Sequence, residues 1–138
     1  LQKSGDVNTV ILASDTIVVL GEEVFGKPEG KFDAIRMLLR LSQSTHRVLT
    51  AVSVKCYSKS KTICSESVVT FRAISPEEAE DYWETGEPRG KAGAYAIQGL
   101  GAIFIQSIKG SYSGVMGLPL FETAELLREF GIDTWQKF

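Results

Sequence analysis

The sequence predicts a single α/β domain over residues 1–138, with a mixed sheet and flanking helices. Runs rich in β-branched residues alternate along the chain with stretches of helical period. The length of 138 residues lies in the range of one domain with its own core. No internal repeat or low-complexity linker divides the chain.

Runs of β-branched residues place the strands. The predicted strands are residues 8–20 (as one strand or two), 48–54, 68–71 and 102–108. Turns are predicted at residues 21–23, at the polar hairpin 58–61 and at residues 110–114, where glycine, serine and lysine gather.

Three segments predict helices. In residues 32–41, Arg36 and Arg40 are expected to face water at i, i+4 spacing, and the apolar residues to pack in the core, namely Phe32, Ile35, Met37, Leu38, Leu39 and Leu41. Ser75-Pro76-Glu77-Glu78 is a helix start with a capping box, and the acidic run 77–81 after it is expected to be solvated. Gly86-Glu87-Pro88 ends that helix, and a closing helix over 122–130 stops at Gly131.

Residues 91–101, Lys-Ala-Gly-Ala-Tyr-Ala-Ile-Gln-Gly-Leu-Gly, have neither a helical nor a strand period. Their three glycines suit a loop that approaches a ligand closely. Gln98 carries amide donors and an acceptor that can read the edge of a planar heterocycle, and Lys91 can face an anion. The alternative is a tight turn between two strands with solvated polar groups.

A carboxylate interrupts the apolar run of residues 7–20. Asp15 stands where a buried strand does not favour a charge, so it is expected to be paired, metal-bound or shifted in pKa. Lys27 follows on a turn. An anionic ligand with a metal ion would satisfy both groups, and the alternative is an ion pair between Asp15 and Lys27 at a strand end.

Composition narrows the function classes. The net charge of −2 argues against a nucleic-acid partner, which favours a basic patch. With neither a signal peptide nor an apolar run of membrane length, the sequence predicts a soluble, cytoplasmic protein. Cys56 and Cys64 are expected to be reduced thiols, because two cysteines make no disulfide framework or zinc spacing.

Three further side chains are weak candidates for catalysis. His46, the single histidine, is expected to be structural or exposed, because nothing near it in the sequence completes a triad. Ser111 and Ser113 lack an evident base and are not expected to be nucleophiles.

Seven motifs in one order resemble the Maf family of nucleoside triphosphate pyrophosphatases, which are distantly similar in fold to the inosine triphosphatases. They are Ser14-Asp15-Thr16-Ile17-Val18, Gly26-Lys27-Pro28, Thr45-His46-Arg47-Val48-Leu49-Thr50, Gly86-Glu87-Pro88, Lys91-Ala92-Gly93-Ala94-Tyr95, Ile97-Gln98-Gly99-Leu100-Gly101 and Gly117-Leu118-Pro119-Leu120. The resemblance covers nearly the whole chain and implies the family's fold.

The resemblance implies hydrolysis of a nucleoside triphosphate at the α–β anhydride, with a divalent metal such as Mg²⁺ or Mn²⁺. Asp15 matches the acidic residue that accepts the proton of the attacking water and lies close to the metal. Thr16 and Gln98 match positions tied to base selection in the branch that prefers dTTP and UTP, and Lys27 matches a lysine at the nucleotide site. Relatives are associated with septum inhibition, and a homodimer is possible.

The chain departs from the family pattern at three places. Gly90 stands where Asp is usual, and Ala96 where Gly is usual. The family's Ser-x-Ser-Pro-Arg-Arg segment, a basic loop that clamps the triphosphate, has no counterpart in the fourteen residues ahead of Asp15. The resemblance thus implies an N-terminally incomplete copy, and the alternative function is a nucleotide-binding or septation-related interaction module without turnover.

Overall fold

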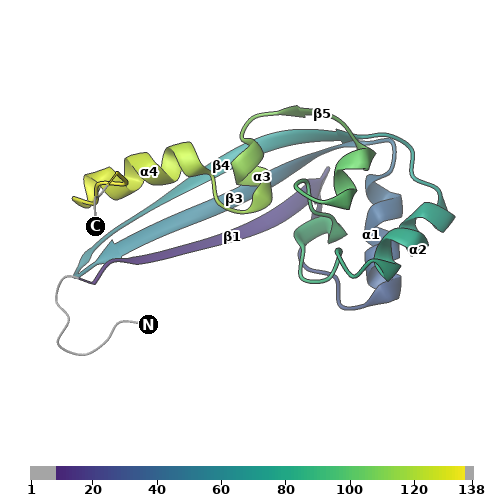
Figure 1. Ribbon diagram of the computed structural model, residues 1–138, viewed down its shortest axis with the longest axis horizontal. Helices are drawn as coiled ribbons and strands as arrows, with labels where there is room; N and C mark the ends of the chain where they lie inside the picture. Colours follow the sequence, from purple (N-terminus) through teal and green to yellow (C-terminus); the bar gives the residue numbers. More distant parts are fainter. Residues whose placement is uncertain (1–8, 136–138) are drawn as a thin grey trace.

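The computed structural model describes residues 9–135, which form a five-stranded sheet with helices packed on it (Figure 1). The sheet order is β2-β1-β3-β4-β5, and every neighbouring pair is antiparallel. The strands are β1 (Ile11–Leu20), β2 (Glu23–Phe25), β3 (Thr45–Cys56), β4 (Lys59–Phe71) and β5 (Ile105–Lys109). The predicted α/β class with flanking helices is therefore confirmed, but the sheet of the described residues is antiparallel throughout rather than mixed as predicted.

The helices divide between the two ends of the sheet. They are α1 (Lys31–Leu41), α2 (Pro76–Glu84), α3 (Tyr112–Met116) and α4 (Leu120–Glu129), with two 3-10 helices, η1 (Ala92–Ala94) and η2 (Leu100–Phe104). Figure 1 shows α1 and α2 gathered at one end, α4 lying along the long strands at the other, and α3 between them. We call the α1, α2, η1 and η2 end the lobe. The opposite end is the arm, formed by α4 and the strand segments 11–15, 51–56 and 59–64 that it lies along.

Alternation along β3 explains why the helices cover one face of the sheet. Even-numbered residues from His46 to Val54 are buried, whereas their odd-numbered neighbours from Thr45 to Lys55 are exposed or half-buried. Successive side chains of a strand point to opposite faces, so the even face carries the core. The other face of β3 carries polar side chains such as Arg47, Ser53 and Lys55.

The strands extend further than the sequence predicts. Strand β3 spans Thr45–Cys56 rather than 48–54, and β4 spans Lys59–Phe71 rather than 68–71. The predicted hairpin at 58–61 is a tighter turn at Tyr57-Ser58, and the polar residues after it belong to β4. Sequence hydrophobicity misses this part of β4 because residues 59–62 are exposed, and backbone pairing with β3 alone defines them.

Three other predictions need correction. The turn at 21–23 is shorter, because Glu23 already belongs to β2. The strand predicted over 102–108 begins only at Ile105, since η2 occupies 100–104. Residues 112–116 form α3 rather than the predicted turn, and Ser111 caps that helix by accepting a hydrogen bond from Gly114 N–H at 2.8 Å.

Helix α1 is confirmed, but two of the residues assigned to its core are exposed. Phe32 is 87% exposed and Leu39 is 37% exposed. The buried side chains are those that share one helical face, namely Ala34, Met37, Leu38 and Leu41. Arg36 and Arg40 are solvent-facing as predicted, and both bind the carboxylate of Glu23.

Helices α2 and α4 follow the sequence signals closely. Ser75 accepts from Glu78 N–H at 3.1 Å, and the Glu78 carboxylate accepts from Ser75 N–H, which completes the capping box. Helix α4 begins at Leu120, two residues before the predicted start, and Gly131 follows its end with a φ of 81°. Within residues 9–135, no helix is long and apolar enough to cross a membrane.

Candidate functional site

A cavity of about 200 Å³ lies where β1, the Lys27 turn, the loop of residues 91–101 and α3 meet. All five site residues predicted from the sequence line it: Asp15, Thr16, Lys27, Lys91 and Gln98. The cavity also takes in Ser14, Tyr95 and Met116. Residues as far apart in the sequence as Ser14 and Gly117 therefore meet in one cavity.

Asp15 reaches the cavity from the free edge of β1. Residues 11–17 pair only with β3 within the described chain, because β2 covers β1 at residues 18–20 alone. The Asp15 carboxylate is exposed and accepts a hydrogen bond from Thr16 N–H at 3.0 Å. The expectation of a buried carboxylate is wrong, since nothing described covers this part of the strand.

The predicted alternative for Asp15, an ion pair with Lys27, does not occur among residues 9–135. Within these residues, no carboxylate oxygen lies within ion-pair distance of Lys27 or Lys91. The charge of Lys91 nevertheless contributes to lowering the pKa of Glu87. Lys27 is exposed and Lys91 is half-buried. Both ammonium groups are therefore available to an anion in the cavity.

Thr16 belongs to a chain of hydroxyl groups that runs under the cavity. Thr16 lies opposite Thr50 in the β1–β3 register, and their Oγ1 atoms are 2.9 Å apart. The buried Thr50 hydroxyl donates to the carbonyl oxygen of Gly114 in α3 at 2.7 Å. Beside them, Ser14 Oγ donates to the carbonyl oxygen of Gly117 at 3.0 Å. These bonds join β1, β3 and α3 at the cavity floor.

Residues 91–101, which we call the site loop, fold as η1 and the start of η2 rather than as a turn between strands. Gly93 N–H donates to Gly26 O at 3.1 Å, which places the loop beside the turn that carries Lys27. Gly93 has a φ of 71°, and a Cβ there would lie 2.8 Å from Val18 Cγ2. Only glycine fits both the backbone angle and this contact.

Glu87 anchors the far half of the site loop. Its carboxylate accepts from Leu100 N–H at 2.8 Å and from Gly101 N–H at 2.9 Å, and it also accepts from the Tyr82 hydroxyl. The Tyr82 hydroxyl in turn accepts from Ala96 N–H at 3.1 Å. These bonds fix the backbone on both sides of Gln98, which is exposed toward the cavity.

The electrostatics of Glu87 follow from these bonds. Burial alone would raise the pKa of Glu87. The hydrogen bonds from Tyr82, Leu100 and Gly101 have the larger combined effect, so the pKa of Glu87 lies below its ordinary value. Burial raises the pKa of Tyr82, and the bond to Glu87 raises it further. The sequence predicted Glu87 only as part of a helix-ending motif, and the signal for a further role was that Gly86-Glu87-Pro88 is one of the seven motifs that carry the family resemblance.

His46 supports Tyr95, which lines the cavity. The imidazole is 1% exposed, and its Nε2 lies 2.7 Å from the Tyr95 hydroxyl. Burial lowers the pKa of His46 to about 4, so the ring is neutral near pH 7. Of the two alternatives predicted for His46, structural or exposed, the burial of the ring excludes the exposed one, and its buried Nδ1 has no hydrogen-bond partner within residues 9–135.

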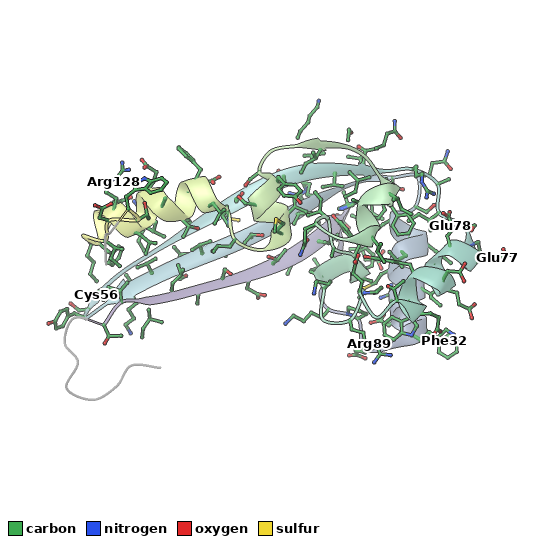
Figure 2. All side chains as sticks on the ribbon, in the orientation of Figure 1. Phe32, Cys56, Glu77, Glu78, Arg89 and Arg128 are labelled. Carbon is green, nitrogen blue, oxygen red and sulfur yellow. The ribbon has the colours of Figure 1, made fainter. Side chains whose placement is uncertain are left out.

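The other weak candidates lie outside the cavity. Ser111 Oγ caps α3, and Ser113 Oγ accepts from Leu120 N–H at 2.9 Å, so both hydroxyls are structural. Cys56 and Cys64 are free thiols, as predicted. Figure 2 places Cys56 at the tip of the arm, far from the lobe that carries Glu77 and Glu78.

The cavity offers one carboxylate to a metal ion. Among residues 9–135, no group of three or more His, Cys, Asp or Glu side chains is placed to hold one. Mg²⁺ commonly binds one or two carboxylates together with substrate phosphates and water. Asp15 with its exposed carboxylate fits a cation that arrives with a polyphosphate, and it does not fit a site built from protein ligands alone.

Comparisons with known proteins show which sequences this chain resembles. Residues 2–130 match the family model of the Maf-like proteins. The chain is 53% identical to a dTTP/UTP pyrophosphatase of Albidiferax ferrireducens over 131 residues, which cover 95% of the chain and 66% of that relative. It is 59% identical to a dTTP/UTP pyrophosphatase of Cupriavidus pinatubonensis over 119 residues, covering 86% and 60%. The chain thus spans 60 to 66% of the length of these curated relatives.

Proposed function

The chain belongs to the family of Maf-like proteins, and from this premise we propose that it carries the site of a nucleoside triphosphate pyrophosphatase acting on dTTP and UTP. The products are the nucleoside monophosphate and pyrophosphate. The relatives with 53% and 59% identity bear the name of this activity. Modified pyrimidine triphosphates are further candidate substrates.

One observation supports the proposal more than any other: a carboxylate, two lysines and an amide from three separate segments line a single cavity. A triphosphate needs cations for its oxygens, and a base needs an amide or hydroxyl to read its edge. A cavity of about 200 Å³ is smaller than typical drug-sized ligand sites of roughly 300–1,000 Å³. We infer that it encloses the base and sugar while the phosphates lie toward the exposed Asp15 and Lys27.

The residues divide the chemistry among them. Asp15 accepts a proton from a water molecule as the water oxygen attacks the α-phosphorus. The bond from the α-phosphorus to the α–β bridging oxygen breaks, and its electron pair leaves with pyrophosphate. Lys27 and Lys91 stabilise negative charge on the phosphate oxygens. Thr16 and Gln98 contact the base.

A divalent cation, Mg²⁺ or Mn²⁺, would neutralise phosphate charge when bound beside Asp15. Asp15 Oδ1 accepts one bond from Thr16 N–H, and both carboxylate oxygens keep lone pairs for the cation or the water. Cytoplasmic location and lack of a nucleic-acid partner stay predictions. A homodimer is supported by exposed apolar side chains near the cavity on α3 and α4, where Met116 is 46%, Leu120 61% and Phe121 76% exposed.

The test is release of pyrophosphate, detected as phosphate after coupling to inorganic pyrophosphatase. Wild-type protein should hydrolyse UTP and dTTP in the presence of Mg²⁺ and lose this activity with a chelator. Asp15→Asn should reduce turnover by roughly 10²–10⁴-fold. Asp81→Asn is the matched control, because Asp81 is exposed on α2 away from the cavity. Full turnover in Asp15→Asn would remove Asp15 from the mechanism.

A second candidate function is nucleotide binding without turnover, as an interaction module in septation. It is favoured by the small number of cations at the cavity, where Lys27 and Lys91 alone face a triphosphate within the described residues. Two lysines are a weak match for several phosphate charges. Calorimetric binding of UTP with no pyrophosphate release would support this candidate over the first.

A further inference from the structure

The hydroxyl chain beneath the cavity has a fixed direction. The carbonyl oxygen of Gly114 can only accept, so the proton between it and Thr50 Oγ1, 2.7 Å away, belongs to Thr50. Thr50 has a single hydroxyl proton. The 2.9 Å contact between Thr16 and Thr50 therefore uses the proton of Thr16, which donates to Thr50.

This direction decides what Thr16 offers to a ligand. Its one proton points away from the cavity toward Thr50, and only its lone pairs remain for a group in the cavity. Thr50 is fully buried at 0% exposure, so no water competes for its lone pairs. Thr16 is consequently an acceptor and not a donor on the cavity wall.

The base edges of the pyrimidines differ at the matching position. Uracil and thymine carry a ring N–H next to a carbonyl oxygen, whereas cytosine carries a bare ring nitrogen next to an amino group. A hydroxyl oxygen that accepts can form a hydrogen bond with the ring N–H of uracil or thymine, whereas its lone pair repels the lone pair of the bare ring nitrogen of cytosine. Gln98, which lines the same cavity, has amide donors for the carbonyl oxygen.

We propose that Thr50 is a positioning residue that holds the Thr16 hydroxyl as an acceptor toward the cavity, and that this orientation selects uracil and thymine over cytosine. The inference rests on the proposed function for its substrate class. The inference goes beyond the proposed function because it gives Thr50 a role in base choice. Thr50 does not line the cavity and acts through Thr16.

The test compares UTP with CTP in hydrolysis, and UMP with CMP in calorimetric binding. Thr50→Val removes the acceptor for the Thr16 proton and frees that proton to turn toward the cavity. We expect the preference for uracil over cytosine to fall on the order of tenfold, mainly by a gain for cytosine. Thr50→Ser keeps the hydroxyl and should restore the wild-type preference.

Thr70→Val is the matched control. Thr45 and Thr70 form another cross-strand hydroxyl pair at 2.9 Å in the same sheet, at an exposed position outside the cavity. Its loss should leave the preference unchanged. If Thr50→Val does not fold, Thr50→Ala takes its place, because it also removes the acceptor for the Thr16 proton, and the preference for UMP over CMP should fall in the same way.

The outcomes separate this inference from the proposed function. Hydrolysis of UTP with a preference unaltered in Thr50→Val or Thr50→Ala overturns the role of Thr50 and leaves the pyrophosphatase standing. Absence of turnover with a UMP preference that falls in Thr50→Val supports the role and overturns the pyrophosphatase. A wild-type protein that binds neither monophosphate, or both equally, overturns the role of Thr50.

Discussion

The lobe and the arm differ in how much core holds them. Sixteen buried residues from the lobe and the strand ends beneath it form one cluster, in which aromatic side chains such as Phe71, Tyr95 and Phe104 contact one another. The cluster in the arm has three buried residues, Val52, Val54 and Leu126. The cavity lies at the boundary between the two.

This difference in packing also separates the parts of the site. The site loop, with Lys91 and Gln98, is held by the lobe through Glu87 and Tyr82. Asp15 stands on a strand edge that no described segment covers. We infer that Gln98 on the lobe recognises the base together with Thr16 on β1, and that Asp15, next to Thr16 on the β1 edge, supplies the exposed carboxylate for the reaction.

The largest expected effect compares one substitution in both clusters. Leu38→Ala in the lobe should lower the free energy of unfolding by about 4 kcal/mol, and Leu126→Ala in the arm by about 2 kcal/mol, although the two leucines are 0% and 1% exposed. Leu126 belongs to the smaller cluster, so shortening its side chain removes fewer packing contacts than shortening that of Leu38. Urea denaturation of both variants measures the difference, and equal losses would show that the arm is as tightly packed as the lobe.

The next effect is a pH dependence located in the lobe. Burial lowers the pKa of His46 to about 4 in the folded protein, below its ordinary value of 6.5. Between these values the unfolded chain binds a proton that the folded chain does not, so stability is full above pH 6.5 and falls as the pH drops toward 4. The loss should be about 3 kcal/mol.

His46→Gln removes this titration while keeping a polar group near Tyr95. Denaturation at pH 7 and pH 4.5 should therefore show a smaller loss in the variant than in the wild type. An equal loss of unfolding free energy between pH 7 and pH 4.5 in both proteins would mean that His46 does not cause the loss of stability in acid.

A third, smaller effect concerns the anchor of the site loop. Glu87→Gln keeps one acceptor oxygen for the bonds that the carboxylate receives, so we expect a loss of about 1–2 kcal/mol in stability at pH 7. Because the folded pKa of Glu87 is lowered, its contribution is present above the ordinary pKa of 4.5 and is lost as the pH falls below it. The stability difference between variant and wild type should shrink at pH 3.

The smallest effect is expected at the β1 edge. Asp15 is exposed and bonds only to Thr16 N–H within the described chain, so Asp15→Asn should change the free energy of unfolding by less than about 0.5 kcal/mol. Asp81→Asn provides the comparison on α2. A loss above about 1 kcal/mol would give Asp15 a structural role that the contacts do not account for.

The sequence predicted which residues share a cavity better than it predicted their surroundings. Asp15, Thr16, Lys27, Lys91 and Gln98 stand in motifs whose family resemblance implied one site, and they line one cavity, while their roles stay predictions. The exposure of Asp15 was not predictable, because an apolar run does not reveal which edge of a strand stays uncovered. The partners of Thr50 and Glu87 were not predictable either, because they are distant in sequence and meet only after folding. Thr50 contacts Thr16, 34 residues away, and Glu87 binds Leu100 N–H, 13 residues away.

The fold was predictable where local signals decide it. The capping box at Ser75 and the glycine after α4 define helix ends by bonds within a few residues. The first residues of β4 and the short β2 depend on backbone pairing with distant strands. Phe32 shows the same limit, because its apolar side chain matches the helix pattern and nothing described packs over it.

The central claim, that Gln98 recognises the base and Asp15 performs the reaction, is tested most directly by steady-state kinetics of Asp15→Asn and Gln98→Leu with four nucleoside triphosphates. We predict that Asp15→Asn lowers kcat for UTP by roughly 10²–10⁴-fold with little change in KM. Gln98→Leu should raise KM for UTP and dTTP more than for CTP and ATP, because the base loses its amide partner. Equal losses across all four bases in Gln98→Leu, or an unchanged kcat in Asp15→Asn, would contradict this division of the cavity.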